Sequence, residues 1–471
     1  MEIQKRIGFF LGPAFFVATL LIQPLELELQ NSVLAVAAWM IAWWVVEVFP
    51  IYITAMLPMV FFPALGIMGL KETFTPYASP IVFLFLGGFL IALAMEERKL
   101  HQRIAFGLIR LTGTKPRGII LGFMVATAIV AMWISNTATT VMMLPIGLSV
   151  IALMNDQGLE EKLMKRFGLL IMLGIAYAAN IGGTMTLIGT PPNLVFAGYY
   201  FEQTGVEFPF ADWLLIGIPT GLTLLITGYV LLIKLIYPIS NAPIPGVETM
   251  FLEKWKELGK MKRGESMVLA VFGITVFSWI MLDPINELLG SKLLNNVNVA
   301  VGGGLLMFFV PVDWKKGEFI MSWDSTKRLP WGILILFGGG LSLASGLETA
   351  GIIDSIALWV SGNAGSSVVV ICIGLTLLAI FLTEIMSNVA LVTVLLPIVF
   401  SIANQMGADP LILTIPVTLA ASCAFMMPIS TPPNAIVYSS GQISVSQMMR
   451  AGIWMNLIAV VIIVTVVLVL L

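Results

Sequence analysis

The sequence predicts an all-α protein that crosses a membrane many times and contains two inverted repeats. Of its 471 residues, 59% are hydrophobic and 11% are charged, whereas soluble proteins carry about 25% charged residues. Within these apolar surroundings, the same polar and helix-breaking motifs occur in each half of the chain. Duplicated interruptions of membrane helices are typical of secondary transporters, whose binding site lies where the two repeats meet.

Three pairs of motifs define the repeats. Ser135-Asn136-Thr137 corresponds to Ser387-Asn388-Val389, and a Leu-Pro-Ile sequence follows each of them at the same spacing. Thr-Pro-Pro-Asn occurs at 190–193 and again at 431–434. A Gly-Gly pair precedes these motifs in each half, at 87–88 and at 338–339. The shared order of the pairs indicates an internal duplication.

A helix needs about 20 apolar residues to cross a bilayer. Two apolar stretches, 118–153 and 366–403, instead carry a Ser-Asn pair near the middle with a proline after it. We expect these two to form re-entrant helical hairpins with Ser-Asn at the tip, buried in protein or beside a watery cavity. By length and composition, the sequence predicts about 11 membrane-spanning helices, at 7–22, 31–49, 51–69, 79–96, 167–188, 212–236, 266–284, 293–311, 330–347, 410–428 and 448–471.

The basic residues predict the orientation of these spans. With the amino terminus in the cytoplasm, all 24 Lys and Arg residues except Lys71 and Lys292 lie on the cytoplasmic side, as the positive-inside rule requires. The carboxyl terminus then lies outside the plasma membrane, and the two repeats have opposite directions. Segments 99–112 and 351–361 are expected to be amphipathic helices along the membrane surface.

The repeats also predict a division into scaffold and transport parts. Each transport part contains one Gly-Gly span, one hairpin and one broken span. The predicted parts are scaffold helices (1–78), the first transport part (79–201), further scaffold helices with a cytoplasmic linker (202–329, linker 238–265 with a short helix at 248–262), the second transport part (330–440) and the last membrane helix (441–471).

The Ser-Asn tips suit an anion with two charged ends. Ser, Asn and Thr are helix N-cap residues, and a helix N-terminus presents free N–H groups with a partial positive charge. Two half-helices that begin at the tips aim these donors at one point without a buried Lys or Arg. The Asn136 and Asn388 amides and the Thr137 hydroxyl add donors for carboxylate oxygens. Ordinary capping explains one tip, but two matched tips favour a binding site.

Thr-Pro-Pro-Asn interrupts one predicted span in each half. Pro191 and Pro192 have no backbone N–H group and disfavour a helix just before them. The carbonyl groups near Gly189 and Ser430 should therefore lose their helical partners and face the interior. Unwound carbonyls of this kind coordinate sodium in transporters. A simple proline kink is the alternative interpretation.

At these residues the chain resembles the divalent anion–sodium symporter family, whose members carry Krebs-cycle dicarboxylates. The resemblance covers nearly the whole chain. It implies a homodimer in which each transport part moves as an elevator, with sodium as the coupling ion and succinate, malate or fumarate as substrate. The substrate-facing residues that it implies are Asn136, Thr137, Pro191, Asn388, Val389 and Pro432.

The same resemblance implies two sodium sites. The first would consist of Ser135, Asn136 and the Gly189 carbonyl, and the second of Thr383, the Met386 carbonyl, Asn388 and the Ser430 carbonyl. Two residues depart from the family pattern. Ala131 and Val389 stand where a Ser and a Thr are usual, so one hydroxyl is missing at the first sodium site and one beside the substrate. A sodium-independent dicarboxylate exchanger of the same fold is therefore the alternative function.

Charged residues inside predicted spans are functional candidates by default. Glu384 lies three residues before Ser387, whereas the matching residue of the first hairpin is Met132. We favour a packing role for Glu384, in which its carboxylate binds backbone amides. His101, the sole histidine, follows Lys99 in a basic surface segment, and we expect it to be solvated.

Other functional classes fit less well. A membrane hydrolase needs a zinc motif, an aspartate pair or a Ser/His dyad, and a chain with one histidine and no such spacing is not expected to be an enzyme. The net charge of -2 gives no basis for binding nucleic acid. An anion channel is less favoured, because inverted duplication around a two-ended site suits alternating access.

Overall fold

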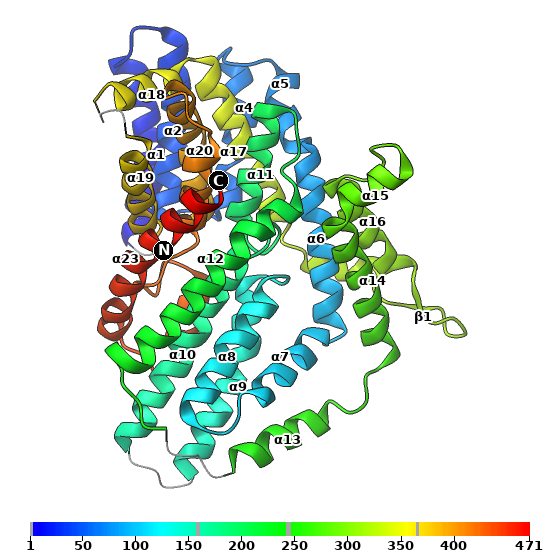
Figure 1. The fold of residues 1–471 in the computed structure, drawn as a ribbon. Coiled ribbons are helices and arrows are strands. Elements are labelled where there is room, and N and C mark those ends of the chain that lie inside the picture. The colour runs from blue at the N-terminus through cyan, green and yellow to red at the C-terminus, as the bar shows by residue number, and fades with distance from the viewer. Residues whose placement is uncertain (1–2, 157–160, 242–245, 364–366) are drawn as a thin grey trace.

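The protein is a bundle of membrane-type helices (Figure 1). The computed structural model describes residues 3–156, 161–241, 246–363 and 367–471. Within these ranges, β structure is limited to one antiparallel hairpin, formed by β1 (Pro311–Asp313) and β2 (Glu318–Phe319). The all-α polytopic class predicted from the sequence is confirmed.

Ten helices in the described part of the chain are long and apolar enough to cross a membrane. All of them except α9 and α20 correspond to predicted spans, and these two are the second arms of the predicted hairpins. The ten are α1 (Ile3–Ile22), α2 (Glu28–Val46), α6 (Pro80–Glu97) with the preceding α5 (Leu70–Phe74), α9 (Asn136–Asp156), α10 (Glu161–Thr184), α12 (Phe210–Val230) with a π-helical end (Leu231–Ile236), α14 (Arg263–Ile280), α17 (Trp331–Thr349), α20 (Asn388–Gln405) and α23 (Val445–Leu470).

A second group of apolar helices is shorter. The 16 residues of α8 span about 24 Å at 1.5 Å per residue, less than the roughly 30 Å of a hydrocarbon core. This length suits the first arm of a re-entrant hairpin. Residue 366, the predicted start of the second hairpin, lies outside the described residues. The group contains α3 (Ile51–Thr54), α4 (Leu57–Ala64), α8 (Pro116–Ala131), α16 (Asn296–Phe309), α19 (Val368–Leu382) and α21 (Leu411–Ala421).

The remaining helices connect these elements. Three of them form at the predicted surface and linker segments, namely α7 (Leu100–Leu111), α18 (Ile352–Asn363) and α13 (Val247–Glu257). Pro243 and Pro245 of the predicted linker lie outside the described residues. The others are α11 (Pro191–Thr204), α15 (Leu282–Leu289), α22 (Pro432–Ser439) and two short 3-10 helices (Thr75–Ala78 and Trp323–Arg328).

Two predicted spans are interrupted. Residues 51–69 form α3 and α4, because Pro58 has no N–H group and disfavours a helical residue before it. The Tyr77 hydroxyl donates to the Ala55 carbonyl at this break (2.6 Å). The predicted span 410–428 ends early at Ala421, where α21 gives way to an irregular segment that extends to α22.

The two repeats interlock at the centre of the molecule. The second arm of the first hairpin, α9, packs against α22 of the second repeat. The second arm of the other hairpin, α20, packs against α11 of the first repeat. This reciprocal packing is the arrangement expected of inverted repeats. It brings both hairpin tips close to both helix breaks.

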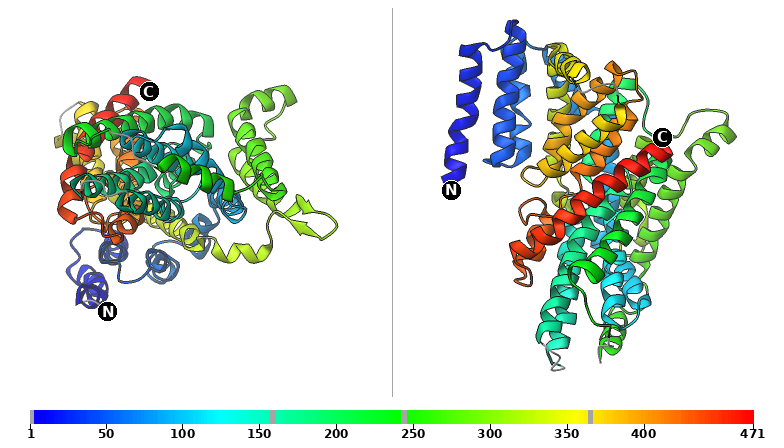
Figure 2. Two further views of the ribbon diagram at one scale, coloured as in Figure 1. Left: turned by 90° about the horizontal axis from the view of Figure 1, so that it is seen from below. Right: turned by 60° about the vertical axis from the view of Figure 1, so that its left-hand side comes forward.

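Other helices surround this centre on two sides (Figure 2). Helices α1 and α2 pack against each other at one edge, and α14 with α16 lies on another side of the bundle. Helix α12 packs against α10 and α23, and α23 also contacts α19 and α21. The linker helix α13 packs against α7 at one end of the molecule.

Candidate functional site

The first hairpin tip is the short turn between α8 and α9. Ser135 caps α9, because its hydroxyl oxygen accepts a hydrogen bond from the Ala138 N–H (3.2 Å). Asn136 begins the helix, and its side-chain oxygen is buried without a donor among the described residues. Gly183 of α10 allows this close approach, since a Cβ there would lie 2.6 Å from that oxygen. The tip therefore presents a buried oxygen with free lone pairs.

The second hairpin tip lies between α19 and α20 and is arranged differently. The Thr383 hydroxyl oxygen lies 2.6 Å from the Asn388 side-chain oxygen and 2.5 Å from the Ala421 carbonyl oxygen. A hydroxyl has one hydrogen and donates to one of these two acceptors at a time. Three oxygen atoms thus lie together with a single proton among them, which is a favourable environment for a small cation.

The two helix breaks are held in the same way. The Asn193 amide donates to the carbonyls of Gly183 (3.1 Å) and Thr186 (2.8 Å). The Asn434 amide donates to the carbonyls of Ala424 and Met427, both at 3.0 Å. The last residue of each Thr-Pro-Pro-Asn motif therefore stabilises the irregular segment before its own helix by donating hydrogen bonds to carbonyl groups there. The sequence shows the repeated Asn, but it does not show which carbonyl groups accept these hydrogen bonds.

Glu384 joins the second tip to the second helix break. Its side chain is 4% exposed and has no basic partner within the described residues. Several donors satisfy an ionised carboxylate without a cation. This confirms the interpretation of Glu384 as a packing carboxylate. Its oxygens accept hydrogen bonds from the N–H groups of Phe425 (2.8 Å), Met426 (2.9 Å) and Met427 (3.0 Å), the Ser430 hydroxyl (2.5 Å) and the Asn456 amide (2.8 Å).

Helix α10 of the first repeat also supports the second break. The Tyr177 hydroxyl donates to the Phe425 carbonyl (2.9 Å). The Asn180 amide donates to the Ala424 carbonyl and to the Thr431 hydroxyl, both at 3.2 Å. These residues and Asn456 were not identified from the sequence. Each is a polar side chain in an apolar helix, which is the signal that marks functional positions in membranes.

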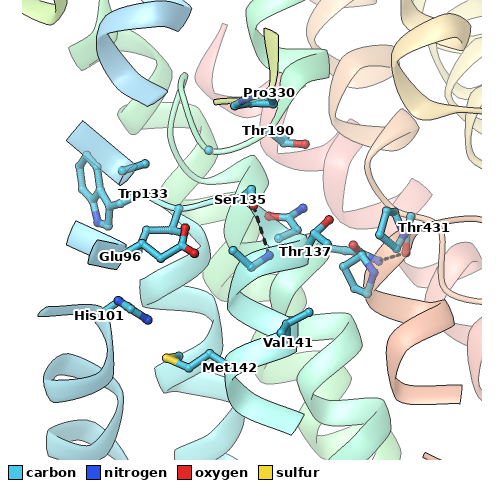
Figure 3. A pocket seen from close by; sticks show the side chains of 18 of the residues that line it. Glu96, His101, Trp133, Ser135, Thr137, Val141, Met142, Thr190, Pro330 and Thr431 are labelled. Carbon is cyan, nitrogen blue, oxygen red and sulfur yellow. Dashed lines mark hydrogen bonds between the residues drawn. The ribbon is translucent and has the colours of Figure 1, made fainter. Parts of the chain in front are cut away.

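The tips and breaks line one cavity of about 1440 Å³. Figure 3 shows Ser135, Thr137, Thr190 and Thr431 around the same space. All six predicted substrate-facing residues line it, together with Ser135, Gly189 and Ser430 of the predicted sodium sites. Thr383 and Met386 do not line it. Thr383 is buried behind Asn388, to which it is hydrogen-bonded.

The cavity is also lined by charged residues of both signs. Lys99, Lys254 and Arg328, from segments that the sequence places on the cytoplasmic side, line it together with Glu47, Glu96 and Glu97. His101 also lines the cavity (Figure 3), but it is only 6% exposed and its Nδ1 lies 3.1 Å from the Met95 carbonyl oxygen. The expectation of a solvated histidine was therefore wrong. Burial lowers the pKa of His101 below its ordinary value.

The chemistry of the site suits binding. No group of three or more His, Cys, Asp or Glu side chains converges on one point in the part of the chain that the structure describes. The tips instead offer two helix N-termini, amide groups, hydroxyl groups and carbonyl oxygens. Helix N-termini favour anions, and clustered neutral oxygens favour a hard cation.

Comparisons with known proteins agree with this chemistry. The family model described as "Sodium:sulfate symporter transmembrane region" matches residues 6–470. The sodium-dependent dicarboxylate transporter SdcS of Staphylococcus saprophyticus is 39% identical over 473 residues, which cover 99% of this chain and 91% of the relative. SdcS of Staphylococcus aureus strain USA300 is 39% identical over 470 residues, with 98% and 90% covered.

A solved structure shares the fold. The YdaH transporter of Alcanivorax borkumensis superposes with a TM-score of 0.59 and 13% sequence identity, covering 87% of this chain and 89% of that chain. That transporter is described as having an unusual topology. The family match across nearly the whole length, together with the level of identity to SdcS, decides the classification. The chain belongs to the divalent anion:sodium symporter family and is a membrane transporter, not an enzyme.

Proposed function

We propose that the protein is a secondary active transporter that carries C4 dicarboxylates with sodium across the plasma membrane. Relatives that align with nearly the whole chain at 39% identity are named sodium-dependent dicarboxylate transporters. The observation that carries the proposal is the convergence of two equivalent asparagines, Asn136 and Asn388, on one cavity. A ligand with two anionic ends suits two equivalent tips.

The substrate is held by the two tips. Helices α9 and α20 begin at the tips, and their N-terminal N–H groups favour negative charge. We assign one carboxylate to Asn136 and Thr137 and the other to Asn388. Succinate, malate and fumarate have this two-ended form. The cavity wall between the tips includes Val389, Pro191 and Pro432.

Sodium supplies the positive charge that the tips lack. For the first site we propose Ser135, Asn136 and the Gly189 carbonyl, supported by the unpartnered oxygen of Asn136. The second site is supported by the oxygen cluster around Thr383, to which the structure adds the Ala421 carbonyl. The proposed ligands of the second site are Thr383, the Met386 carbonyl, Asn388 and the Ser430 carbonyl.

Transport requires the site to reach both sides of the membrane. We propose a homodimer in which the hairpins move as an elevator against a scaffold, with α7 and α18 as arms. The division expected from the sequence assigns α12 to the scaffold. Its packing against α10 and α23 supports assigning it to the moving part. The charged residues from predicted cytoplasmic segments that line the cavity support a state that is open to the cytoplasm.

Transport assays test the function. Labelled succinate uptake into proteoliposomes should saturate and should require an inward sodium gradient. Uptake that needs internal dicarboxylate and ignores sodium would establish the exchanger instead, which the missing hydroxyls at Ala131 and Val389 favour. Non-saturating flux without counterflow would indicate a channel. Absence of dicarboxylate transport under all these conditions would refute the proposal.

A crosslink tests the elevator. Trp133 at the first tip contacts Phe272 of α14, with ring centroids 4.9 Å apart. Cysteines at both positions, in a background without Cys372 and Cys423, should be bridged by a short thiol crosslinker and arrest transport until the crosslinker is cleaved. A bridge within the moving part, between positions 199 and 400 on α11 and α20, is the matched control. Full activity of the Trp133–Phe272 crosslinked protein would favour local gating.

A further inference from the structure

A second pocket of about 600 Å³ lies on the outer surface of the helix bundle. It is bounded by the start of α10, the end of the π-helix after α12 and the first turns of α23. It shares no lining residue with the transport cavity. Its lining residues are Glu161, Lys162, Lys165, Arg166, Leu169, Ile236, Tyr237, Gln447 and Arg450.

Two hydrogen bonds fix the frame of this pocket. Arg166 donates to the Pro238 carbonyl at 2.6 Å, which joins α10 to the segment after the π-helix. The Tyr237 hydroxyl donates to the Gln447 carbonyl at 2.8 Å, which joins that segment to α23. Three elements that are far apart in sequence are thereby held in one arrangement, so the pocket is part of the folded structure.

The charge of the pocket is strongly positive. Four basic side chains and one acidic side chain line it. Glu161 pairs with Lys165 at 2.5 Å, whereas Lys162 and Arg450 have no ion pair within the described residues. Arg450 lies close enough to Tyr237 for its positive charge to oppose the rise in the phenol pKa that burial causes. Two cations therefore remain available to an anionic ligand.

An exposed apolar stripe begins at this pocket. On α23, Arg450 is followed at helical spacing by Trp454, Leu457 and Val461, whose exposed fractions are 53%, 41% and 65%. Leu235, beside the pocket residue Ile236, is 71% exposed. A basic pocket that continues into an apolar stripe matches a phospholipid, with its charged headgroup and its acyl chains.

We propose that this pocket binds the headgroup of an anionic phospholipid, with Lys162 and Arg450 on the phosphate and an acyl chain along Trp454, Leu457 and Val461. The positive-inside pattern places the pocket at the cytoplasmic surface, where anionic lipids and basic pockets between helices meet. A free phosphate satisfies the basic residues alone and leaves the apolar stripe unused. The stripe is the reason for choosing a lipid.

Native mass spectrometry of the detergent-purified full-length protein tests the proposal. Titration with dioleoyl phosphatidylglycerol should give adducts that dioleoyl phosphatidylcholine does not give at the same concentration. Lys162→Gln with Arg450→Gln should weaken phosphatidylglycerol binding roughly thirtyfold, because two basic contacts with an anionic headgroup are lost. Lys260→Gln with Lys262→Gln makes the same change of charge at exposed linker positions and should retain wild-type binding.

Two further measurements separate the possible ligands. Trp454→Ala should weaken phosphatidylglycerol binding without altering any charge, since it removes part of the acyl-chain surface. Inorganic phosphate at an equal concentration should not displace the lipid. Displacement by phosphate, equal binding of the two lipids, or wild-type binding by the Lys162/Arg450 variant would overturn the proposal. The replaced side chains are exposed, so unchanged melting temperatures should verify that the variants fold.

Discussion

The two hairpin tips have equivalent positions but different internal bonding. At the second tip, Glu384 receives five hydrogen bonds from the neighbouring loop and α23, and Thr383 contacts Asn388. At the first tip, Met132 stands in place of the carboxylate, and its carbonyl accepts from the Thr186 hydroxyl at 2.5 Å. The Asn136 oxygen there has no donor among the described residues.

Because of this difference, the two tips differ in how well ordered they are before a ligand binds. The second tip is preorganised, because its loop is bound through a buried charge whose hydrogen bonds are about twice as strong as neutral ones. The first tip leaves an acceptor unsatisfied, and an unsatisfied buried polar group costs about 1–3 kcal/mol. A bound cation would remove that cost. We therefore expect the first tip to depend more on its ligands for order than the second.

The largest effect on transport should come from the asparagine that both tips share. Asn136→Ala or Asn388→Ala removes a group that we assign to both substrate and sodium. Losing a hydrogen bond to a charged group costs about 1.5–3 kcal/mol, and two such losses should reduce succinate uptake at least about a hundredfold. Uptake into proteoliposomes measures this effect.

The control is Asn404→Ala, an exposed position on the same helix as Asn388. It should transport like the wild type, and all three variants should elute as folded protein. Near-normal uptake by either the Asn136 or the Asn388 variant would remove the central claim about the tips.

The second-largest effect should come from Glu384, the residue that makes the bonding of the two tips different. Glu384→Gln places an amide among donors that need an acceptor, so the loop before α22 should loosen. We expect a clearly lower melting temperature and a roughly tenfold or greater loss of uptake, because several charge-assisted hydrogen bonds weaken together. Met132→Gln at the equivalent first-tip position should change both quantities much less. Equal effects at the two positions would contradict the proposed difference.

The sequence predicted the parts of the fold that depend on local signals. Both hairpins and both broken helices were found because Ser-Asn and Pro-Pro act on the chain immediately around them. The early end of α21 at Ala421 was missed. That end depends on a loop that binds Glu384, and Asn456 in turn donates to the Glu384 carboxylate. Both residues are distant from the loop in sequence, so no local pattern reveals the end of α21.

Prediction of the site from the sequence has the same limit, because it also depends on local motifs. The residues of the repeated motifs that line the cavity were identified, whereas Asn180, which also lines it, and Tyr177 act across the repeats and were not. His101 was misjudged for a related reason. Its neighbours Lys99 and Arg103 suggest solvent, but burial depends on how α7 packs against α6, α8 and α13. Charge in the sequence does not determine which side of a helix is covered.

A smaller effect should follow from the oxygen cluster of the second tip. Thr383→Val removes the hydroxyl but keeps the shape, so the sodium concentration for half-maximal uptake should rise about tenfold. Thr376→Val is the matched control, because Thr376 is equally buried on α19, the helix that Thr383 ends, and its hydroxyl donates to the Cys372 carbonyl. A shift shared by both variants would point to general loosening of α19 and against a sodium ligand.

The smallest effect should come from restoring an oxygen at the first tip. Ala131 is fully buried at the end of α8, and Ala131→Ser restores a hydroxyl at the position where the family pattern has one. If the first site is a weakened sodium site, the sodium concentration for half-maximal uptake should fall several-fold. A full hydrogen bond to a charged group would lower it by about tenfold or more. The expected change is smaller because the surroundings are not shaped for the added hydroxyl. Ala126→Ser, equally buried on the same helix, should leave sodium dependence unchanged. Tight sodium-driven uptake by the wild type, with no response to Ala131→Ser, would show that the missing hydroxyl does not set the coupling and that both tips already bind sodium fully.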